Sequence, residues 1–253
     1  MSKLLWIIGG LLCPVLISMA QHRPSNFQWG AQSTYLYEAL SGGRAPWQTG
    51  TLTLHLSHQQ TTALSEWTFV QRFGRWDMAV ALEGWTTLWP HAYGNARLQF
   101  SPAADFLPTH ESYLELYQSI RAWELAMAFR YRHFSTQQVA TWGLATGLYT
   151  GPWYLRTQAL LTPLAGQLNW TQRFMVRRYG PSLLSFVEMQ AGYGRGVEII
   201  DVGPVLKRVR TYFVTARVQQ LLTPNVGVTF TLSYSHDDLF TRRGVALGLL
   251  MRW

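Results

Sequence analysis

The chain has little of what a secreted soluble domain relies on. Its 253 residues include a single cysteine, Cys13, so no disulfide can form within the chain. Charged residues make up only 13% of the sequence, about half the share that is usual in soluble domains. These are too few to coat a soluble surface. Stability must therefore come from burial or from a closed network of backbone hydrogen bonds.

Lysine is also scarce, since Lys207 is the only lysine after the first 20 residues. The formal net charge is +8 and the pI is about 9.9, a balance that nucleic-acid-binding proteins share. The basic side chains are scattered singly, however, without a zinc-ligand spacing or a recognition-helix pattern. We therefore expect no nucleic-acid partner. Arginine rather than lysine suits ion pairs at low dielectric and contacts with lipid phosphates.

The start of the chain has the pattern of a cleavable signal peptide. Lys3 precedes an apolar run over residues 4–17, and small residues then flank a cleavage site after Ala20. The run is short for a membrane-spanning helix and contains a proline, which argues against a retained anchor. We expect a signal peptide over residues 1–20 and one domain over residues 21–253.

The abundant features are aromatic residues, with 12 each of Trp, Tyr and Phe, and apolar residues at every second position. In the last segment Val245, Leu247 and Leu249 alternate with smaller residues, and the chain ends at Trp253. A strand between lipid and a wet interior needs this period of two, and an aromatic end suits the membrane interface. About 14 segments alternate in this way, and none has convincing helical periodicity. A soluble sandwich also alternates, but the strand number, aromatic ends and leader favour a barrel.

The sequence thus predicts an all-β fold, an antiparallel transmembrane β-barrel of about 14 strands in the bacterial outer membrane. Twelve strands remain an alternative, because the segments over residues 51–73 have the weakest pattern. With the C terminus in the periplasm, short inward turns and longer outward loops are expected. The outward loops fall near residues 40–48, 73–75, 101–111, 135–138, 162–166, 194–204 and 235–243. The inward turns fall near residues 120–122, 150–152, 179–181 and 222–225.

If the apolar set faces lipid, the alternating set faces the interior of the barrel. It includes Glu38, Arg72, Tyr93, Tyr113, Tyr117, Tyr154 and Thr215. The expected pore-lining residues are Asp77, Glu83, Arg97, Glu115, Glu124, Arg130, Arg156, Arg173, Arg177, Glu188 and Arg217. One interpretation is an ion-pair network that fills a narrow barrel. The other is a channel that favours anions through its excess of arginine.

The tryptophan and histidine residues allow two further predictions. Four tryptophans are expected to be exposed: Trp85, Trp89, Trp142 and Trp153. We expect them to be anchors at lipid headgroups, and contact with a neighbouring barrel is the alternative. No metal site and no cofactor are expected, because the closest histidine pair, His55 and His58, has a spacing that places the two on opposite faces of a strand.

An alternative function comes from His133-Phe134-Ser135, which places a histidine and a serine two residues apart, on one face if both lie in a strand. Outer-membrane lipid A deacylases carry a similar His-x-Ser pair in which histidine activates the serine nucleophile. No acid that could orient His133 is identifiable in the sequence. The alternative is therefore an outer-membrane lipid-modifying enzyme that uses His133 and Ser135.

Several short motifs resemble the YaiO-type outer-membrane β-barrel family. They are Arg72-Phe73-Gly74-Arg75, Tyr117-Gln118-Ser119 with Trp123-Glu124, Phe129-Arg130-Tyr131 and Arg177-Arg178-Tyr179. The resemblance runs from about Arg72 to the C terminus. It implies a small outer-membrane barrel and brings no established substrate or catalytic residues. We expect a non-enzymatic barrel in contact with outer-membrane lipid and lipopolysaccharide. It would be structural, or a passive pore or export channel for small solutes, anions among them, or for envelope polysaccharide.

Overall fold

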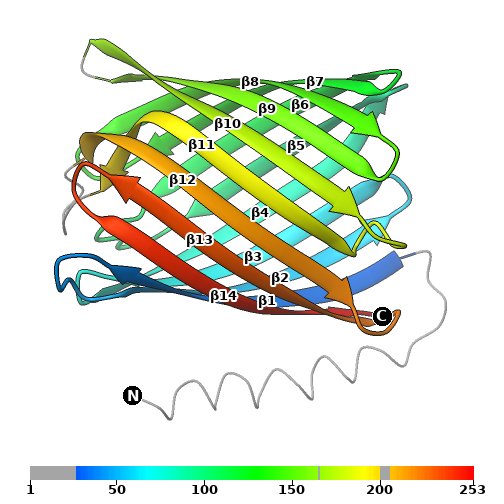
Figure 1. The fold of residues 1–253 in the computed structure, drawn as a ribbon, viewed down its shortest axis with the longest axis horizontal. Helices are drawn as coiled ribbons and strands as arrows, with labels where there is room; N and C mark the ends of the chain where they lie inside the picture. Colours follow the sequence, from blue (N-terminus) through cyan, green and yellow to red (C-terminus); the bar gives the residue numbers. More distant parts are fainter. Residues whose placement is uncertain (1–26, 165, 200–205) are drawn as a thin grey trace.

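The protein folds into a closed antiparallel β-barrel (Figure 1). A computed structural model describes residues 27–164, 166–199 and 206–253. The predicted signal peptide, residues 1–20, lies outside the described residues. The strands are β1 (Phe27–Leu40), β2 (Trp47–His58), β3 (Thr61–Arg72), β4 (Arg75–Trp89), β5 (Ala92–Phe100), β6 (His110–Ile120), β7 (Trp123–His133), β8 (Gln138–Thr150), β9 (Trp153–Leu164), β10 (Gln167–Tyr179), β11 (Phe186–Ile199), β12 (Leu206–Leu221), β13 (Val226–Asp237) and β14 (Thr241–Arg252).

The barrel closes between its first and last strands. β1 pairs with β14 from Gly30 opposite Arg252 to Leu40 opposite Arg242. The backbone groups of Trp29 and Trp253 also exchange two hydrogen bonds of 3.1 Å. No sheet edge is left among the paired strands, which satisfies the backbone within a membrane. The predicted 14-strand barrel is thus confirmed. The 12-strand alternative is wrong, because β2 and β3 are regular members of the ring and pair from Gln48 opposite Gln71 to His58 opposite Thr61.

Alternation within each strand sorts the side chains between two environments. In β7, Trp123, Leu125 and Met127 are exposed on the outer surface, whereas Glu124 and Ala126 are buried inside. Large apolar side chains on the other strands are exposed in the same way, as expected for a surface that meets lipid. Within the described residues there is no helix with the length and apolar character needed to cross a membrane.

The connections differ between the two ends of the barrel. We call the end where β1 begins and β14 ends the proximal end, and the opposite end the distal end. Four proximal turns, at residues 59–60, 90–91, 121–122 and 151–152, have two residues each. The distal loops that the structure describes fall where the sequence predicts outward loops, and the longest of them spans residues 101–109. One proximal connection, residues 180–185, is longer than predicted because its backbone closes a bonded loop between Gly180 and Ser185.

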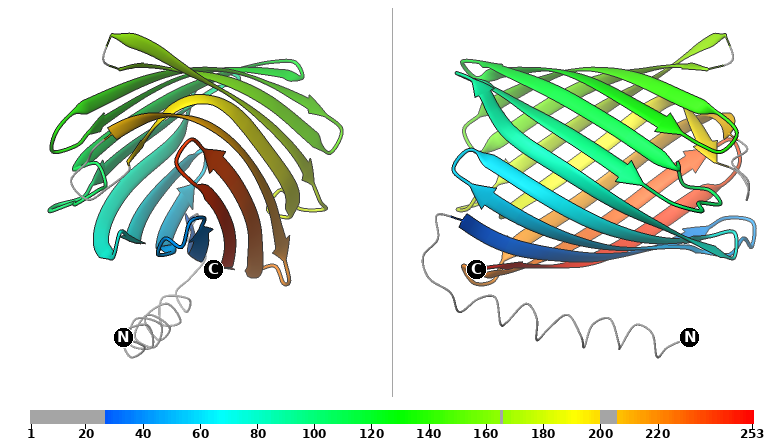
Figure 2. Two further views of the ribbon diagram at one scale, coloured as in Figure 1. Left: turned by 60° about the vertical axis from the view of Figure 1, so that its left-hand side comes forward. Right: turned by 180° about the vertical axis from the view of Figure 1, so that it is seen from behind.

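The order of the strands determines which side chains face one another across the interior. In a ring of 14 strands β4 and β11 are seven positions apart in either direction, so they lie on opposite walls. Figure 1 shows β10–β12 on the near side and β3–β5 behind them, and Figure 2 shows the reverse from behind. Residues that are distant in sequence therefore meet across one interior.

Candidate functional site

All eleven residues that the sequence predicts as pore-lining occupy strand positions that face the barrel interior. Five of them, Asp77, Glu115, Glu124, Glu188 and Arg156, have at most a small part of the side chain exposed. The other six are more exposed, but each lies an even number of positions along its strand from an inward-facing residue or opposite one on the next strand. They are Glu83, Arg97, Arg130, Arg173, Arg177 and Arg217. The interior therefore carries charges of both signs, and the distribution of these charges limits what could pass.

Near the proximal end, Glu124 on β7 is the centre of a tyrosine cluster. Its side chain is 2% exposed and accepts hydrogen bonds from Tyr93 and Tyr154 at 2.5 Å each. Tyr149 donates a third at 3.3 Å. The three tyrosines come from β5, β9 and β8, so with Glu124 on β7 the cluster has members on four strands and spans the inner wall from β5 to β9. A buried carboxylate requires hydrogen-bond donors of this kind.

A second cluster surrounds Glu115 on β6. A guanidinium nitrogen of Arg156 on β9 lies 2.5 Å from its carboxylate, and Tyr113 and Tyr117 donate to the same carboxylate at 2.5 Å. The contact spans β7 and β8, whose inward residues at this level are small: Ala126 and Ala128 on β7, and Gly143, Ala145 and Gly147 on β8. Gly147 illustrates this, because a Cβ there would lie 2.7 Å from the Tyr154 ring. Small residues on β7 and β8 thus provide the space in which large side chains pack, and this narrows the interior.

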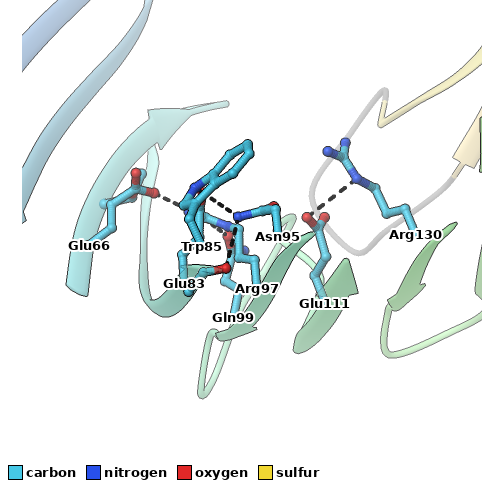
Figure 3. Close-up of polar contacts among 10 residues, drawn as sticks. Glu66, Glu83, Trp85, Asn95, Arg97, Gln99, Glu111 and Arg130 are labelled. Carbon is cyan, nitrogen blue, oxygen red and sulfur yellow. Dashed lines mark hydrogen bonds and ion pairs between the residues drawn. The ribbon is translucent and has the colours of Figure 1, made fainter. Parts of the chain in front are cut away.

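The third group lies on β3, β4 and β5, where two acids share one arginine (Figure 3). Arg97 donates to Glu66 at 2.7 Å and to Glu83 at 3.3 Å. Glu83 also accepts from the Trp85 indole at 2.6 Å and from Asn95 at 2.9 Å. The group therefore carries one negative charge more than its arginine balances.

On the neighbouring strands β6 and β7, Glu111 and Arg130 form a pair at 3.6 Å, also shown in Figure 3. Arg130 also lies over the ring of Tyr113, 4.9 Å from its centroid. This pair is balanced in charge, unlike the group on β3–β5.

The wall formed by β10–β12 has an excess of positive charge among its described residues. Glu188 on β11 is 2% exposed and pairs with Arg177 on β10. Arg217 on β12 lies across from Glu188 in the strand register, yet the carboxylate is held by Arg177. Arg173 lies over the ring of Phe213 at 5.7 Å. Neither Arg173 nor Arg217 forms an ion pair with a carboxylate in the described part of the chain.

A cavity of about 260 Å³ opens beside Arg173. Its lining includes Tyr113, Glu115, Arg156, Arg173, Arg177 and the amide side chains Gln158 and Gln190. The strands β13, β14, β1 and β2 contribute small inward side chains instead: Thr229, Thr231, Ser233, Ala246, Gly248, Thr34, Thr51 and Thr53. The larger polar clusters described above lie on the other wall, on β3–β11.

Aromatic side chains narrow the distal mouth. Trp47, 1% exposed, packs edge-on against Phe73 and Phe240 at 5.5 and 5.4 Å. Phe106 from the loop over residues 101–109 is fully buried and contacts Phe73 at 6.1 Å. We call these four residues the mouth cluster. The Arg72 guanidinium lies 4.3 Å from the Trp47 ring. The sequence did not predict this cluster, because its members come from one strand and three separate connections.

Asp77 on β4 holds the loop of the mouth cluster in place. Its carboxylate, in a residue 5% exposed, accepts backbone hydrogen bonds from Asp105, Phe106 and Leu107 at 2.8–2.9 Å. Hydrogen bonds to an ionised acceptor are about twice as strong as neutral ones. Asp77 thus positions the loop over residues 101–109 rather than facing an open interior.

One sequence-based prediction about tryptophan is wrong. Trp85 does not face lipid, because it shares strand parity with Asp77 and Glu83 and lies inside the barrel. Its ring packs 5.9 Å from Tyr117. The other three are exposed on the outer surface as predicted: Trp89, Trp142 and Trp153.

The histidine and serine of the alternative function are not arranged as predicted. β7 ends at His133, and Ser135 lies exposed in the distal loop over residues 134–137, so the two do not share one strand face. The intervening Phe134 is buried. The His133 ring stacks on His110 at 4.6 Å. Among the described residues no hydrogen bond joins His133 to Ser135.

The described residues contain no group of three or more His, Cys, Asp or Glu that could hold a metal ion. His55 and His58 do lie on opposite faces of β2. The ring of His55 lies over Gly30, where a Cβ would approach it to 1.9 Å, and His58 stacks on Phe27 at 4.3 Å.

Comparison with known proteins places the chain in a family. The family model described as the YaiO membrane beta barrel domain matches residues 30–197. The chain belongs to the YaiO membrane beta barrel family. This confirms the family resemblance that the sequence motifs indicated, with a match that begins at residue 30 and ends at residue 197 rather than running from about Arg72 to the C terminus. No curated protein matches the chain.

Several solved porins have similar folds. The chain is similar to the Salmonella typhi OmpF complex with daunomycin, with 6% identity over 90% of this chain and 97% of that chain and a TM-score of 0.50. It is also similar to Pseudomonas aeruginosa OpdO (9% identity, 90% and 96% coverage, TM-score 0.49). An anion-selective porin from Comamonas acidovorans gives 8% identity, 89% and 98% coverage and a TM-score of 0.48. At these identities the likeness concerns the fold alone.

Proposed function

We propose that this YaiO-family barrel is a non-enzymatic passive pore of the bacterial outer membrane for small solutes, with a preference for anions. A single observation supports the preference: Arg173 and Arg217 are exposed to the interior without a carboxylate partner in the described part of the chain. Glu115, which lines the same cavity as Arg173, pairs with Arg156, and Glu188, which lies across from Arg217 in the strand register, pairs with Arg177. Unpaired cations along a pore lower the barrier for anions.

The size of the solute follows from the packing of the interior. The Glu115 and Glu124 clusters fill the inner wall from β5 to β9, and the cavity beside Arg173 has a volume of only about 260 Å³. Small solutes are therefore favoured over an envelope polysaccharide, which needs a wide continuous path. The outer-membrane location is supported by the closed barrel and by the apolar exterior.

Planar lipid bilayers provide the test. Purified protein is expected to conduct, and in a potassium chloride gradient the reversal potential should show chloride preference. The double variant Arg173→Gln/Arg217→Gln should lower the anion-to-cation permeability ratio about threefold or more, because local potentials of this kind change ion concentrations at least tenfold.

Arg178→Gln is the matched control. Arg178 lies on β10 beside Arg177, but on the outer face, over the Trp153 ring at 5.9 Å. The same loss of charge there should leave selectivity unchanged. A silent bilayer, or a reversal potential that the double variant does not move, would contradict the proposal.

A further inference from the structure

We propose that the interior carries a transverse electric field that favours zwitterionic solutes, molecules with one cationic and one anionic group. The inference rests on the proposed pore function and names its substrate class. It depends on two groups of residues on opposite walls, and neither group would suffice alone.

The acidic wall is formed by β3–β5. Glu66 and Glu83 both pair with Arg97, so among the described residues one arginine serves two carboxylates. Their side chains remain 25% and 21% exposed, which leaves them open to the interior. Figure 3 shows the two carboxylates converging on Arg97 from adjacent strands.

The basic wall is formed by β10–β12. Among the side chains that the structure describes there, Arg173, Arg177 and Arg217 share the inner wall with one acid, Glu188, which pairs with Arg177. The wall therefore has two arginines in excess among its described inward residues. Arg173 also lines the cavity, so its charge is accessible to a solute.

The ring order places the two walls opposite each other, because β4 and β11 are seven strands apart. Glu66, Glu83, Arg173 and Arg217 all lie at least four residues from the ends of their strands, within the barrel rather than at its mouths. On one side between them Glu111 pairs with Arg130 and Glu115 with Arg156, and on the other side Arg242 lies 3.8 Å from Asp237. Glu124 on β7 accepts hydrogen bonds from tyrosines and lies near the proximal end, away from the middle of the barrel. The field between the walls is therefore not cancelled by the strands at the side.

A field across the pore acts differently on different solutes. A single charge is attracted by one wall and repelled by the other. A zwitterion can orient its ammonium group toward Glu66 and Glu83 and its carboxylate toward Arg173 and Arg217, which offsets part of its desolvation. A neutral molecule of the same size gains much less.

Liposome swelling with two isomers tests this directly, using β-alanine as the zwitterion and lactamide as the neutral probe at neutral pH. The ratio of their entry rates should exceed one for the unmodified protein. Glu83→Gln and Arg173→Gln should each lower that ratio at least about twofold. In bilayers the same substitutions should move ion selectivity in opposite directions, toward anions for Glu83→Gln and toward cations for Arg173→Gln.

The directions in which the two variants change the β-alanine preference and the ion selectivity distinguish the field proposal from the pore function alone. A shared decrease in the β-alanine preference, together with opposite shifts in ion selectivity, supports the field. If lactamide enters but the preference for β-alanine is absent or unchanged in both variants, the field proposal is wrong and the pore function stands. If lactamide does not enter, the pore function fails and this proposal fails with it. Glu66→Gln serves if Glu83→Gln does not fold, and Arg178→Gln is the unchanged control.

Discussion

Replacing Arg156 with methionine is expected to lower the free energy of unfolding by about 3 kcal/mol. The reason is the position of Glu115, a residue 5% exposed whose carboxylate lies 2.5 Å from the Arg156 guanidinium. Methionine fills similar space but leaves this buried carboxylate without its cation. Tyr113 and Tyr117 still donate hydrogen bonds to it, but they carry no charge.

Urea unfolding in lipid vesicles, followed by tryptophan fluorescence, measures the loss. The double variant Glu115→Gln/Arg156→Met should recover most of it, because no buried charge is then left unpaired. Arg75→Met is the control: Arg75 pairs with Asp105 at 3.0 Å, but both side chains are well exposed. Such surface pairs contribute about 1 kcal/mol or less. A loss below about 1 kcal/mol for Arg156→Met would show that the pair does not stabilise the barrel.

The sequence was sufficient for those features that depend on a period of two. Alternation along one strand decides which face a residue occupies, so the interior positions of Glu124, Arg173 and Arg217 followed without a structure. Closure followed too, because a transmembrane sheet cannot leave an edge in lipid. The same alternation also determines the position of Trp85, which was predicted wrongly from its residue type. Its parity matches that of Glu83, and the residue type alone suggested a lipid anchor.

The sequence could not reveal which interior residues meet. Arg156 reaches Glu115 across two intervening strands, and Tyr93 reaches Glu124 across one. These contacts depend on the stagger between strands and on small residues such as Ala126 and Gly147 beneath the larger ones. The mouth cluster depends on loop conformation as well. Phe73 adopts a left-handed backbone with φ of 53°, which is uncommon for an aromatic residue.

Replacing Asp77 with alanine is expected to release the loop over residues 101–109 and to raise the single-channel conductance. The carboxylate accepts three backbone hydrogen bonds from this loop, at 2.8–2.9 Å. Each bond to a charged group contributes about 1.5 kcal/mol or more. The loss of two or three of them should raise the released population at least about 100-fold, since 1.4 kcal/mol corresponds to a factor of ten. Phe106 would then leave the mouth cluster and widen the distal opening.

Chymotrypsin provides an independent measure of the release, because it cleaves after aromatic residues and Phe106 is fully buried when the loop is held. Cleavage tracks the released population when the loop opens and closes faster than the protease cuts. We therefore expect cleavage after Phe106, identified by mass spectrometry, to accelerate about 100-fold in Asp77→Ala. Asp105→Asn is the matched control, because it removes a charge from the same loop but breaks only an exposed pair with Arg75. If both variants are cleaved at the same rate, Asp77 does not hold the loop. Faster cleavage without a change in conductance would instead place the narrowest part of the path deeper, beside Arg97 and Arg173.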